Sequence, residues 1–378
     1  MDYGKLALEK HKELRGKIAL SLKDIPDSRE KLSTYYSPGV AAVSSYVAEH
    51  PEEARDYTWL NNTVAVISDG SAVLGLGNIG PYGALPVMEG KAMLFKHFAG
   101  IDSIPIVLDV HTADEIVAAV QAIAPSFGGI NLEDIAAPIC FEVEERLKAT
   151  LNIPVMHDDQ HGTAIVTLAG LINATKVAGR KLGDCKIVIV GAGAAGVAIA
   201  KLLHIYAQPT IIAIDSKGII SNDRTDLNTE KRLLLSFAKG PVANGSLADA
   251  VADADIFIGV SKPGLLTADM VRSMAPDPII FAMANPVPEI MPDEAKAAGA
   301  AVVATGRSDF PNQVNNVLAF PGIFRGALDN KVSKITDKHK VAAAEALASL
   351  VDDPNPDMII PSALDDRLVP AVSKVIVP

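Results

Sequence analysis

Apolar runs alternate with amphipathic stretches along most of the chain, and this pattern predicts strands joined by helices. Residues 64–70, 104–110 and 153–159 have the apolar character of short buried strands. Residues 89–99 and 113–124, which lie between them, have helical spacing. Such alternation is typical of an α/β domain.

A second, tighter alternation begins at residue 186. A strand at 186–190, a glycine loop, a helix at 196–206 and a strand at 210–214 follow one another directly. Further strands are predicted at 254–260, 278–284 and 300–306. This order is typical of a doubly wound, Rossmann-type nucleotide-binding domain.

Helices are also predicted near both ends of the chain. Residues 3–22 form a charged amphipathic segment that either packs against a second subunit or lies solvated on the surface. An alanine-rich helix is expected at roughly 338–351, before a tail that contains several prolines.

Composition narrows the class of protein. The 378 residues are 49% hydrophobic and 21% charged, enough for two packed domains. A net charge of -11 without clustered lysine and arginine argues against nucleic-acid binding. The N-terminus has no apolar signal region and no apolar run is long enough for a membrane span, and there are only two cysteines. We therefore expect a cytoplasmic protein with no membrane partner.

The glycine run in residues 186–203 has the requirements of a dinucleotide loop, namely a preceding strand, spaced glycines and a following helix. The residues expected to bind the cofactor here are Gly191, Gly193, Ala194, Ala195 and Gly196. Asp215 ends the next strand, 24 residues after Gly191, where a carboxylate can accept from the adenosine ribose.

The choice between NAD and NADP stays open at this point. Asp215 would repel a 2′-phosphate and so favours NAD. Lys217 follows two residues later, and a lysine there can bind that phosphate.

Another glycine run, the first in chain order, occupies residues 72–91 and contains Gly75, Gly77 and Gly80. Pro81 and Pro86 follow, so no helix is expected to start where a phosphate would lie. We predict instead a compact loop, and a helix that begins near Met88 and presents Lys91 to a cleft. The alternative is that Lys91 is an exposed helix lysine.

Two pairs of carboxylates follow apolar segments, Glu133 with Asp134 and Asp158 with Asp159. Carboxylate oxygens without thiolates suit a hard divalent cation, Mg²⁺ or Mn²⁺. His157 and His161 have the spacing of a zinc-protease motif, but Asp158 replaces the catalytic glutamate. Both histidines are therefore interpreted as structural.

Together these motifs resemble the malic enzymes, in the short form found in bacteria and archaea. The resemblance covers most of the chain and rests on seven ordered blocks: YYSPGVA (35–41), SDGSAVLGLGNIGPYGALPVMEGK (68–91), LEDIAAP (132–138), HDDQHGTA (157–164), GAGAAG (191–196), ANPVPE (284–289) and NQVNNVLAFPG (312–322).

The resemblance implies roles for individual residues. Tyr36 matches the general acid, Lys91 the general base and Asp158 a carboxylate beside that lysine. The metal ligands it implies are Glu133, Asp134 and Asp159. The residues it implies for the nicotinamide ribose and the substrate carboxylate are Asn285, Asn315 and Asn316, and Lys91 also contacts substrate.

The implied activity is the oxidative decarboxylation of malate to pyruvate and CO₂ with NAD or NADP and Mg²⁺ or Mn²⁺, in a homodimer or larger homo-oligomer. The implied fold is an α/β substrate and metal domain, residues 1–158 with a C-terminal return over 320–378, and an NAD(P)-binding Rossmann domain over 159–319. The alternatives are a metal-dependent oxaloacetate decarboxylase and a catalytically inactive nucleotide-sensing regulator.

One position departs from the family pattern. Larger malic enzymes have an arginine where this chain has Ala72, and that side chain would bind a malate carboxylate. Amides of the first glycine loop, or the asparagines, are expected to bind the carboxylate here.

Overall fold

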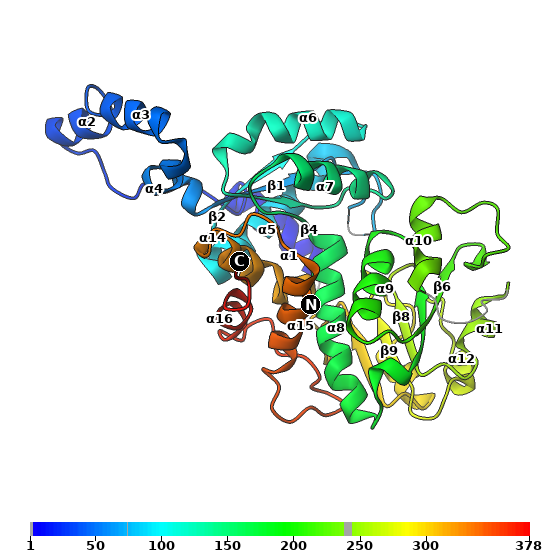
Figure 1. Cartoon of the computed structure of the whole chain (residues 1–378). Helices are drawn as coiled ribbons and strands as arrows, with labels where there is room; N and C mark the ends of the chain where they lie inside the picture. Colours follow the sequence, from blue (N-terminus) through cyan, green and yellow to red (C-terminus); the bar gives the residue numbers. More distant parts are fainter. Residues whose placement is uncertain (1–2, 74, 238–243) are drawn as a thin grey trace.

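Two separate sheets organise the chain, and the computed structural model describes them through residues 3–73, 75–237 and 244–378. The first sheet has four parallel strands in the order β2-β1-β3-β4. The second has six strands in the order β10-β9-β8-β5-β6-β7, of which β7 is antiparallel to β6. The predicted α/β class is therefore confirmed (Figure 1).

Helices cover both faces of the first sheet. Its strands are β1 (Thr63–Ser68), β2 (Asp102–Val107), β3 (Gly129–Leu132) and β4 (Val155–His157), and its helices are α5 (Gly80–Ala99), α6 (Ala113–Ile123) and α7 (Ile139–Thr150). Successive residues of β1 point to opposite faces. Val64 and Val66 pack in the cluster that contains residues of α5, whereas Ala65 and Ile67 pack in the cluster that contains α6 and α7.

The second sheet reverses its strand order beside β5. Its strands are β5 (Lys186–Val190), β6 (Thr210–Asp215), β7 (Gly218–Ile219), β8 (Ile256–Gly259), β9 (Ile279–Ala282) and β10 (Val302–Thr305). Its helices are α9 (Ala194–Tyr206), α10 (Thr229–Phe237), α11 (Leu247–Val251), α12 (Ala268–Ser273) and α13 (Pro292–Ala297). In such sheets the ligand binds beyond the carboxyl ends of the strands at the point of reversal.

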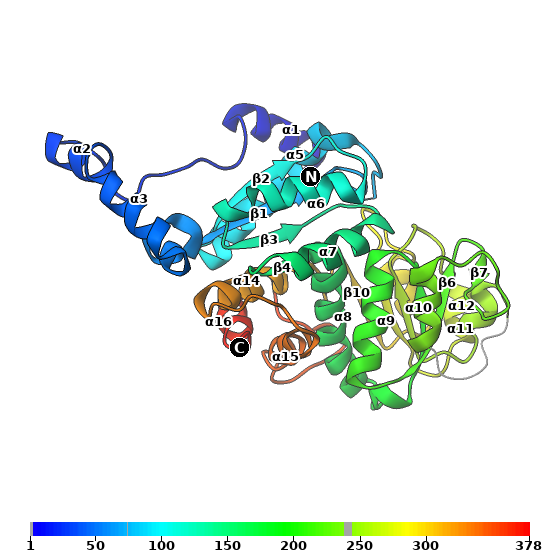
Figure 2. The same cartoon turned by 45° about the horizontal axis from the view of Figure 1, so that its top comes forward.

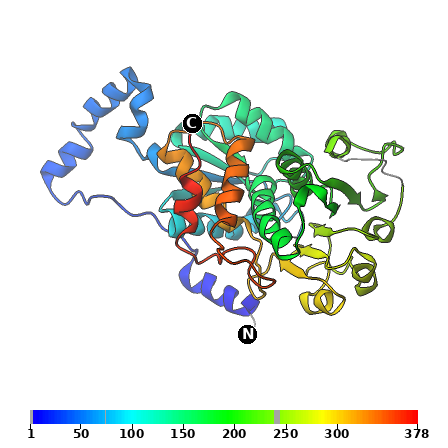
Figure 3. The same ribbon diagram turned by 60° about the horizontal axis from the view of Figure 1, so that its bottom comes forward.

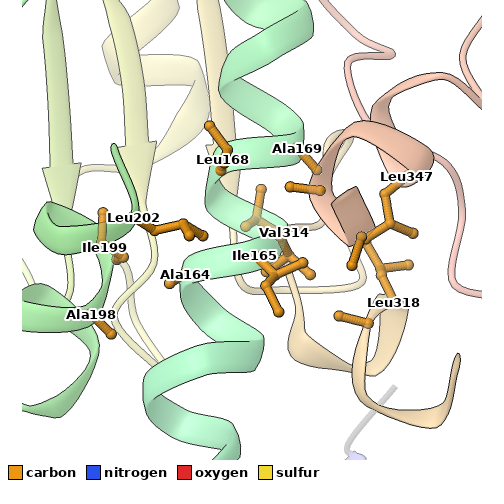
Figure 4. Packing of buried hydrophobic residues seen from close by; sticks show 14 of the residues in the cluster. Ala164, Ile165, Leu168, Ala169, Ala198, Ile199, Leu202, Val314, Leu318 and Leu347 are labelled. Atoms are coloured by element: carbon orange, nitrogen blue, oxygen red, sulfur yellow. The ribbon is translucent and has the colours of Figure 1, made fainter. Parts of the chain in front are cut away.

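A long helix, α8 (Asp158–Val177), joins the two parts, and 15 of its 20 residues are buried. Ile165 and Leu168 of α8 lie between the apolar side chains of α9 and those of Val314, Leu318 and Leu347 (Figure 4). The sequence did not predict α8, because a helix that is buried on nearly all sides lacks a distinct polar face and so lacks amphipathic spacing.

The C-terminal helices pack around α8 and α5 (Figure 3). They are α14 (Phe320–Asp329), α15 (Asp337–Ala348) and α16 (Leu368–Ser373). Phe95 of α5 meets Phe320 and Phe324 of α14 edge-on, at ring separations of 4.7 and 5.4 Å. The predicted domain boundaries at 158/159 and 319/320 stay predictions.

Four helices occupy the N-terminal region, and part of this region forms an arm. The helices are α1 (Tyr3–Leu14), α2 (Arg29–Tyr35), α3 (Val40–Glu49) and α4 (Ala54–Tyr57). Helices α2 and α3 project away from both sheets, and neither contains a buried residue (Figures 1 and 2). Leu32, Tyr35 and Val43 are exposed there.

The described residues also form short 3₁₀ helices, at Pro51–Glu53, Trp59–Asn61, Ala124–Ser126, Leu182–Asp184 and Asn316–Leu318. No helix among the described residues is long and apolar enough to cross a membrane.

Several predicted boundaries are wrong, including three around the site. The N-terminal helix ends at Leu14 rather than residue 22, because Arg15 and Gly16 adopt positive φ angles of 56° and 109°. Helix α5 begins at Gly80, not near Met88, because a proline in the first turn needs no hydrogen-bonded N–H. The strand predicted over 153–159 ends at His157.

Candidate active site

A cavity of about 650 Å³ lies where the two parts of the chain meet. Its lining includes Lys91 of α5 and Asp159 of α8 from the first part, and Ala195 of α9 and Asn285 after β9 from the nucleotide-binding part. The residues predicted from sequence that line this cavity are Lys91, Glu133, Asp159, Ala195, Asn285, Asn315 and Asn316.

Lys91 is buried within a group of carboxylates. Its Nζ lies 2.8 Å from Glu133 Oε1 and 2.5 Å from Asp158 Oδ2, and 4.2 Å from the centre of the Phe320 ring. Burial by itself lowers the pKa of Lys91, but the charges of Asp158, Glu133 and Asp159 outweigh it and raise that pKa. These neighbours therefore favour the ammonium form of Lys91 in the ligand-free protein.

The carboxylates around Lys91 outnumber its single positive charge. Burial raises the pKa of Asp158 to about 7 and that of Asp159 to about 6, although Lys91 opposes both shifts. Burial also raises the pKa of Glu133. One ammonium group cannot neutralise three such neighbours, so the cluster carries excess negative charge.

Hydrogen bonds fix the positions of these acids. The backbone N–H of Asp134 donates to Asp159 Oδ2 over 2.8 Å, and Asn131 donates to Glu133 Oε2 over 3.0 Å. Asp158 Oδ1 is buried without a hydrogen bond to the described residues.

The described residues contain no group of three histidine, cysteine, aspartate or glutamate side chains already converged on a metal position. The carboxylate oxygens of this cluster and its excess negative charge are nevertheless the chemistry that a hard divalent cation prefers. Both histidines contact Glu144: His161 Nε2 is 2.8 Å from Glu144 Oε2, and Glu144 Oε1 accepts the backbone N–H of His157. The His157 ring lies beside the acidic cluster, with Nδ1 3.8 Å from Asp159 Oδ2.

The first glycine run folds against the nucleotide-binding side of the cavity. Gly75 has a φ of +74°, and a Cβ there would lie 2.5 Å from the carbonyl oxygen of Asn285. Gly70, also at positive φ, packs against the backbone of Gly80. These close approaches require glycine, and they bring the loop before α5 to the cavity wall.

The second glycine run has the form predicted for a pyrophosphate loop. Gly191 has a φ of +119°, and a Cβ there would lie 2.6 Å from the carbonyl oxygen of Val260. Helix α9 begins at Ala194, two residues earlier than predicted, with Gly193 before its first turn. The free amides of that turn are suited to an anion.

Asp215 lines a neighbouring cavity of about 640 Å³, together with Ser216 and Lys217. Its carboxylate accepts four hydrogen bonds, from Lys217 N and Arg224 Nη1 at Oδ1 and from Arg224 Nη2 and Lys231 Nζ at Oδ2. Burial alone raises the pKa of Asp215, but these donors outweigh it and lower the pKa to about 2. A ribose hydroxyl would have to replace one of these donors, so the predicted ribose contact stays a prediction.

Tyr36 is not brought to this cavity. It lies between α2 and α3 on the projecting arm, and 74% of its surface is exposed. Among the other predicted residues, Lys91 contacts both Glu133 and Asp158 directly.

Two residues of the site were missed. Glu289 is fully buried, and its carboxylate accepts the backbone N–H groups of Ser261 and Ala284 over 3.0 and 3.1 Å. It thereby joins the loops after β8 and β9, and its place in the ANPVPE block was a signal. Lys17, which also lines the cavity, gave no motif signal.

Comparison with known families matches both parts of the chain. Residues 17–148 match the malic enzyme N-terminal domain, and residues 160–375 match the malic enzyme NAD-binding domain. The chain belongs to the malic enzyme family.

Individual malic enzymes are similar over nearly the whole chain. A bifunctional malic/malolactic enzyme from Bacillus subtilis is 56% identical over 98% of this chain and 91% of its own length. An NADP-dependent malic enzyme from Halomonas elongata is 47% identical over 98% of this chain and 92% of its own length. The crystal structure of an NAD-dependent malic enzyme from Thermotoga maritima, 49% identical, covers 98% of both chains with a TM-score of 0.94. The resemblance found in the sequence is confirmed.

Proposed function

We propose that this chain catalyses the oxidative decarboxylation of malate to pyruvate and CO₂, with reduction of NAD or NADP. The observation that carries the proposal is the shared cavity, in which Lys91 and its carboxylates face the nucleotide-binding loop. Relatives named as NAD-dependent and NADP-dependent malic enzymes support it.

In this reaction Lys91 acts as the base. Its unprotonated form takes the proton of the C2 hydroxyl while C2 gives a hydride to the nicotinamide, which produces a 2-oxo acid. The C3–C4 bond then breaks, CO₂ leaves and the electron pair stays on the enolate. Tyr36 gives a proton to C3, which yields pyruvate.

Glu133, Asp134 and Asp159 would hold a Mg²⁺ or Mn²⁺ ion. Bound there, the ion would supply positive charge that stabilises negative oxygens of the substrate and offsets the carboxylates that keep Lys91 protonated. Asp158 stays paired with Lys91 and orients its ammonium group. Asn285, Asn315 and Asn316 supply uncharged hydrogen-bonding groups for ribose and substrate.

We also propose that the enzyme is a cytoplasmic homodimer in which each arm delivers Tyr36 to the cavity of the other subunit. The exposed position of Tyr36 and the unburied apolar side chains of α2 and α3 support this arrangement. The two buried free cysteines are compatible with a reducing compartment.

The metal requirement gives a direct test of the proposed function. EDTA should abolish the reduction of NAD or NADP by malate, because excess negative charge would remain around Lys91, and Mn²⁺ or Mg²⁺ should restore it. Absorbance of the reduced cofactor measures the first step, and pyruvate release measures the second. Full activity in EDTA would contradict the metal assignment, and pyruvate formed from oxaloacetate without any malate oxidation would favour the simple decarboxylase.

A further inference from the structure

The lining of the active-site cavity includes one positively charged residue besides Lys91, namely Lys17. Among the described residues that line it, the lysines and arginines are Lys17 and Lys91 alone. Lys91 is engaged by Glu133 and Asp158. Glu89 is the acidic residue that acts on the charge of Lys17, but its carboxylate is bonded to the Lys17 backbone N–H and not to the ammonium group, so that group can still bind a ligand.

The backbone around Lys17 is held on helix α5. The Lys17 N–H donates to Glu89 Oε2 over 3.1 Å. Gly16 has a φ of +109°, and a Cβ there would lie 3.1 Å from Glu89 Oε1. A glycine before Lys17 therefore lets the chain turn closely over Glu89.

The Lys17 ammonium group lies beside the segment of α5 that leads to Lys91. Its Nζ donates to the carbonyl oxygen of Pro86 over 2.5 Å, and a Cβ on Gly90 would lie 3.3 Å from it. This single hydrogen bond uses one of three ammonium protons, so two remain for a ligand.

Malate has two carboxylates, and a cation held by the acidic cluster would bind only one of them. Glu133, Asp134 and Asp159 would hold a divalent cation, which would supply the positive charge for the C1 carboxylate and the C2 hydroxyl. The C4 carboxylate needs a positive partner, and Ala72 cannot provide one.

We propose that Lys17 binds the C4 carboxylate of malate, and so selects a four-carbon dicarboxylate as substrate. The assignment rests on the proposed function, since it takes the Lys91 cavity as the malate site. Asn315 and Asn316 are in the same cavity but carry no charge, so they cannot replace Lys17 as the ionic partner. Pyruvate lacks this carboxylate, so the attraction ends once CO₂ has left.

The test compares Lys17→Met with Lys12→Met, a change of an exposed lysine on α1. Loss of a charged hydrogen-bond partner should raise the KM for malate about 10- to 100-fold. The kcat should change less, because C4 binding precedes the chemical step, and the KM for NAD or NADP should stay as in the wild type. Lys17→Arg should restore much of the malate affinity.

A comparison of oxaloacetate with pyruvate separates recognition of the C4 carboxylate from a general loss of active-site structure. Lys17→Met should raise the KM for oxaloacetate reduction, but leave reduction of pyruvate to its hydroxy acid unchanged. If Lys17→Met does not fold, Lys17→Gln removes the charge while keeping a donor for Pro86 O, and the same comparison applies.

An unchanged malate KM in Lys17→Met, or equal losses with oxaloacetate and pyruvate, would overturn the proposal for Lys17. A wild-type protein that does not oxidise malate would instead overturn the proposed function. The two failures are thus distinguished by the wild-type assay alone.

Discussion

Lys91→Met should lose malate oxidation by about 10²- to 10⁴-fold, the usual contribution of a positioned acid or base. The methionine keeps an unbranched chain over Phe320 but has no group to accept the C2 proton. It also leaves Glu133 and Asp158 without their ammonium partner. Initial rates of NAD or NADP reduction, together with the melting temperature, provide the measurement.

Lys96→Met is the matched control on the same helix. Lys96 is exposed and pairs with Asp102 away from the cavity, so its loss should leave the rate near that of the wild type. A folded Lys91→Met protein with wild-type malate oxidation would exclude Lys91 as the base.

Co-expression of Tyr36→Phe and Lys91→Met chains should produce an active heterodimer from two inactive parents. If each arm delivers Tyr36 to the partner's cavity, one of the two sites combines Tyr36 with Lys91. The purified heterodimer should therefore have about half of the wild-type activity in malate decarboxylation. Two different affinity tags allow the mixed dimer to be isolated before the assay.

Each parent homodimer serves as the control, because neither contains a complete site. A heterodimer as inactive as both parents would indicate that Tyr36 and Lys91 act within one chain. A wild-type protein that is monomeric by light scattering at micromolar concentration would exclude the exchanged arm altogether.

Local patterns in the sequence predicted much of the fold. The strands at residues 186–190 and 210–215 and the helix over 113–123 lie within two residues of their expected limits, because short apolar runs and caps are local signals. Helix α8 was missed since burial on all sides removes periodicity. The strand at Gly129–Leu132 was missed because it is only four residues long.

The site residues that could be predicted are those with a reactive side chain inside a recognisable sequence motif. Lys91, Glu133 and Asp158 were proposed from sequence, and the structure joins them in one ion-paired cluster. Contacts that depend on tertiary packing had no comparable signal. Arg224 reaches Asp215 from an irregular segment, and Lys17 reaches the cavity only because its backbone is held by Glu89, 72 residues away.

The protonation of Lys91 could not be predicted either. Burial alone lowers the pKa of a lysine and would favour the neutral amine, whereas nearby carboxylates raise that pKa. The outcome depends on how many carboxylates share the pocket, and only the folded chain brings Glu133 and Asp158 to the same nitrogen.

A crystal structure grown with Mn²⁺, NADH and oxalate tests the proposed active site most directly. Manganese scatters anomalously, so its position can be measured independently of the protein model. We predict one strong anomalous peak coordinated by carboxylate oxygens of Glu133, Asp134 and Asp159, with the nicotinamide beside Asn285 and in reach of the same oxalate. A manganese peak or a nicotinamide outside the Lys91 cavity would contradict the proposal that this cavity carries out both hydride transfer and decarboxylation.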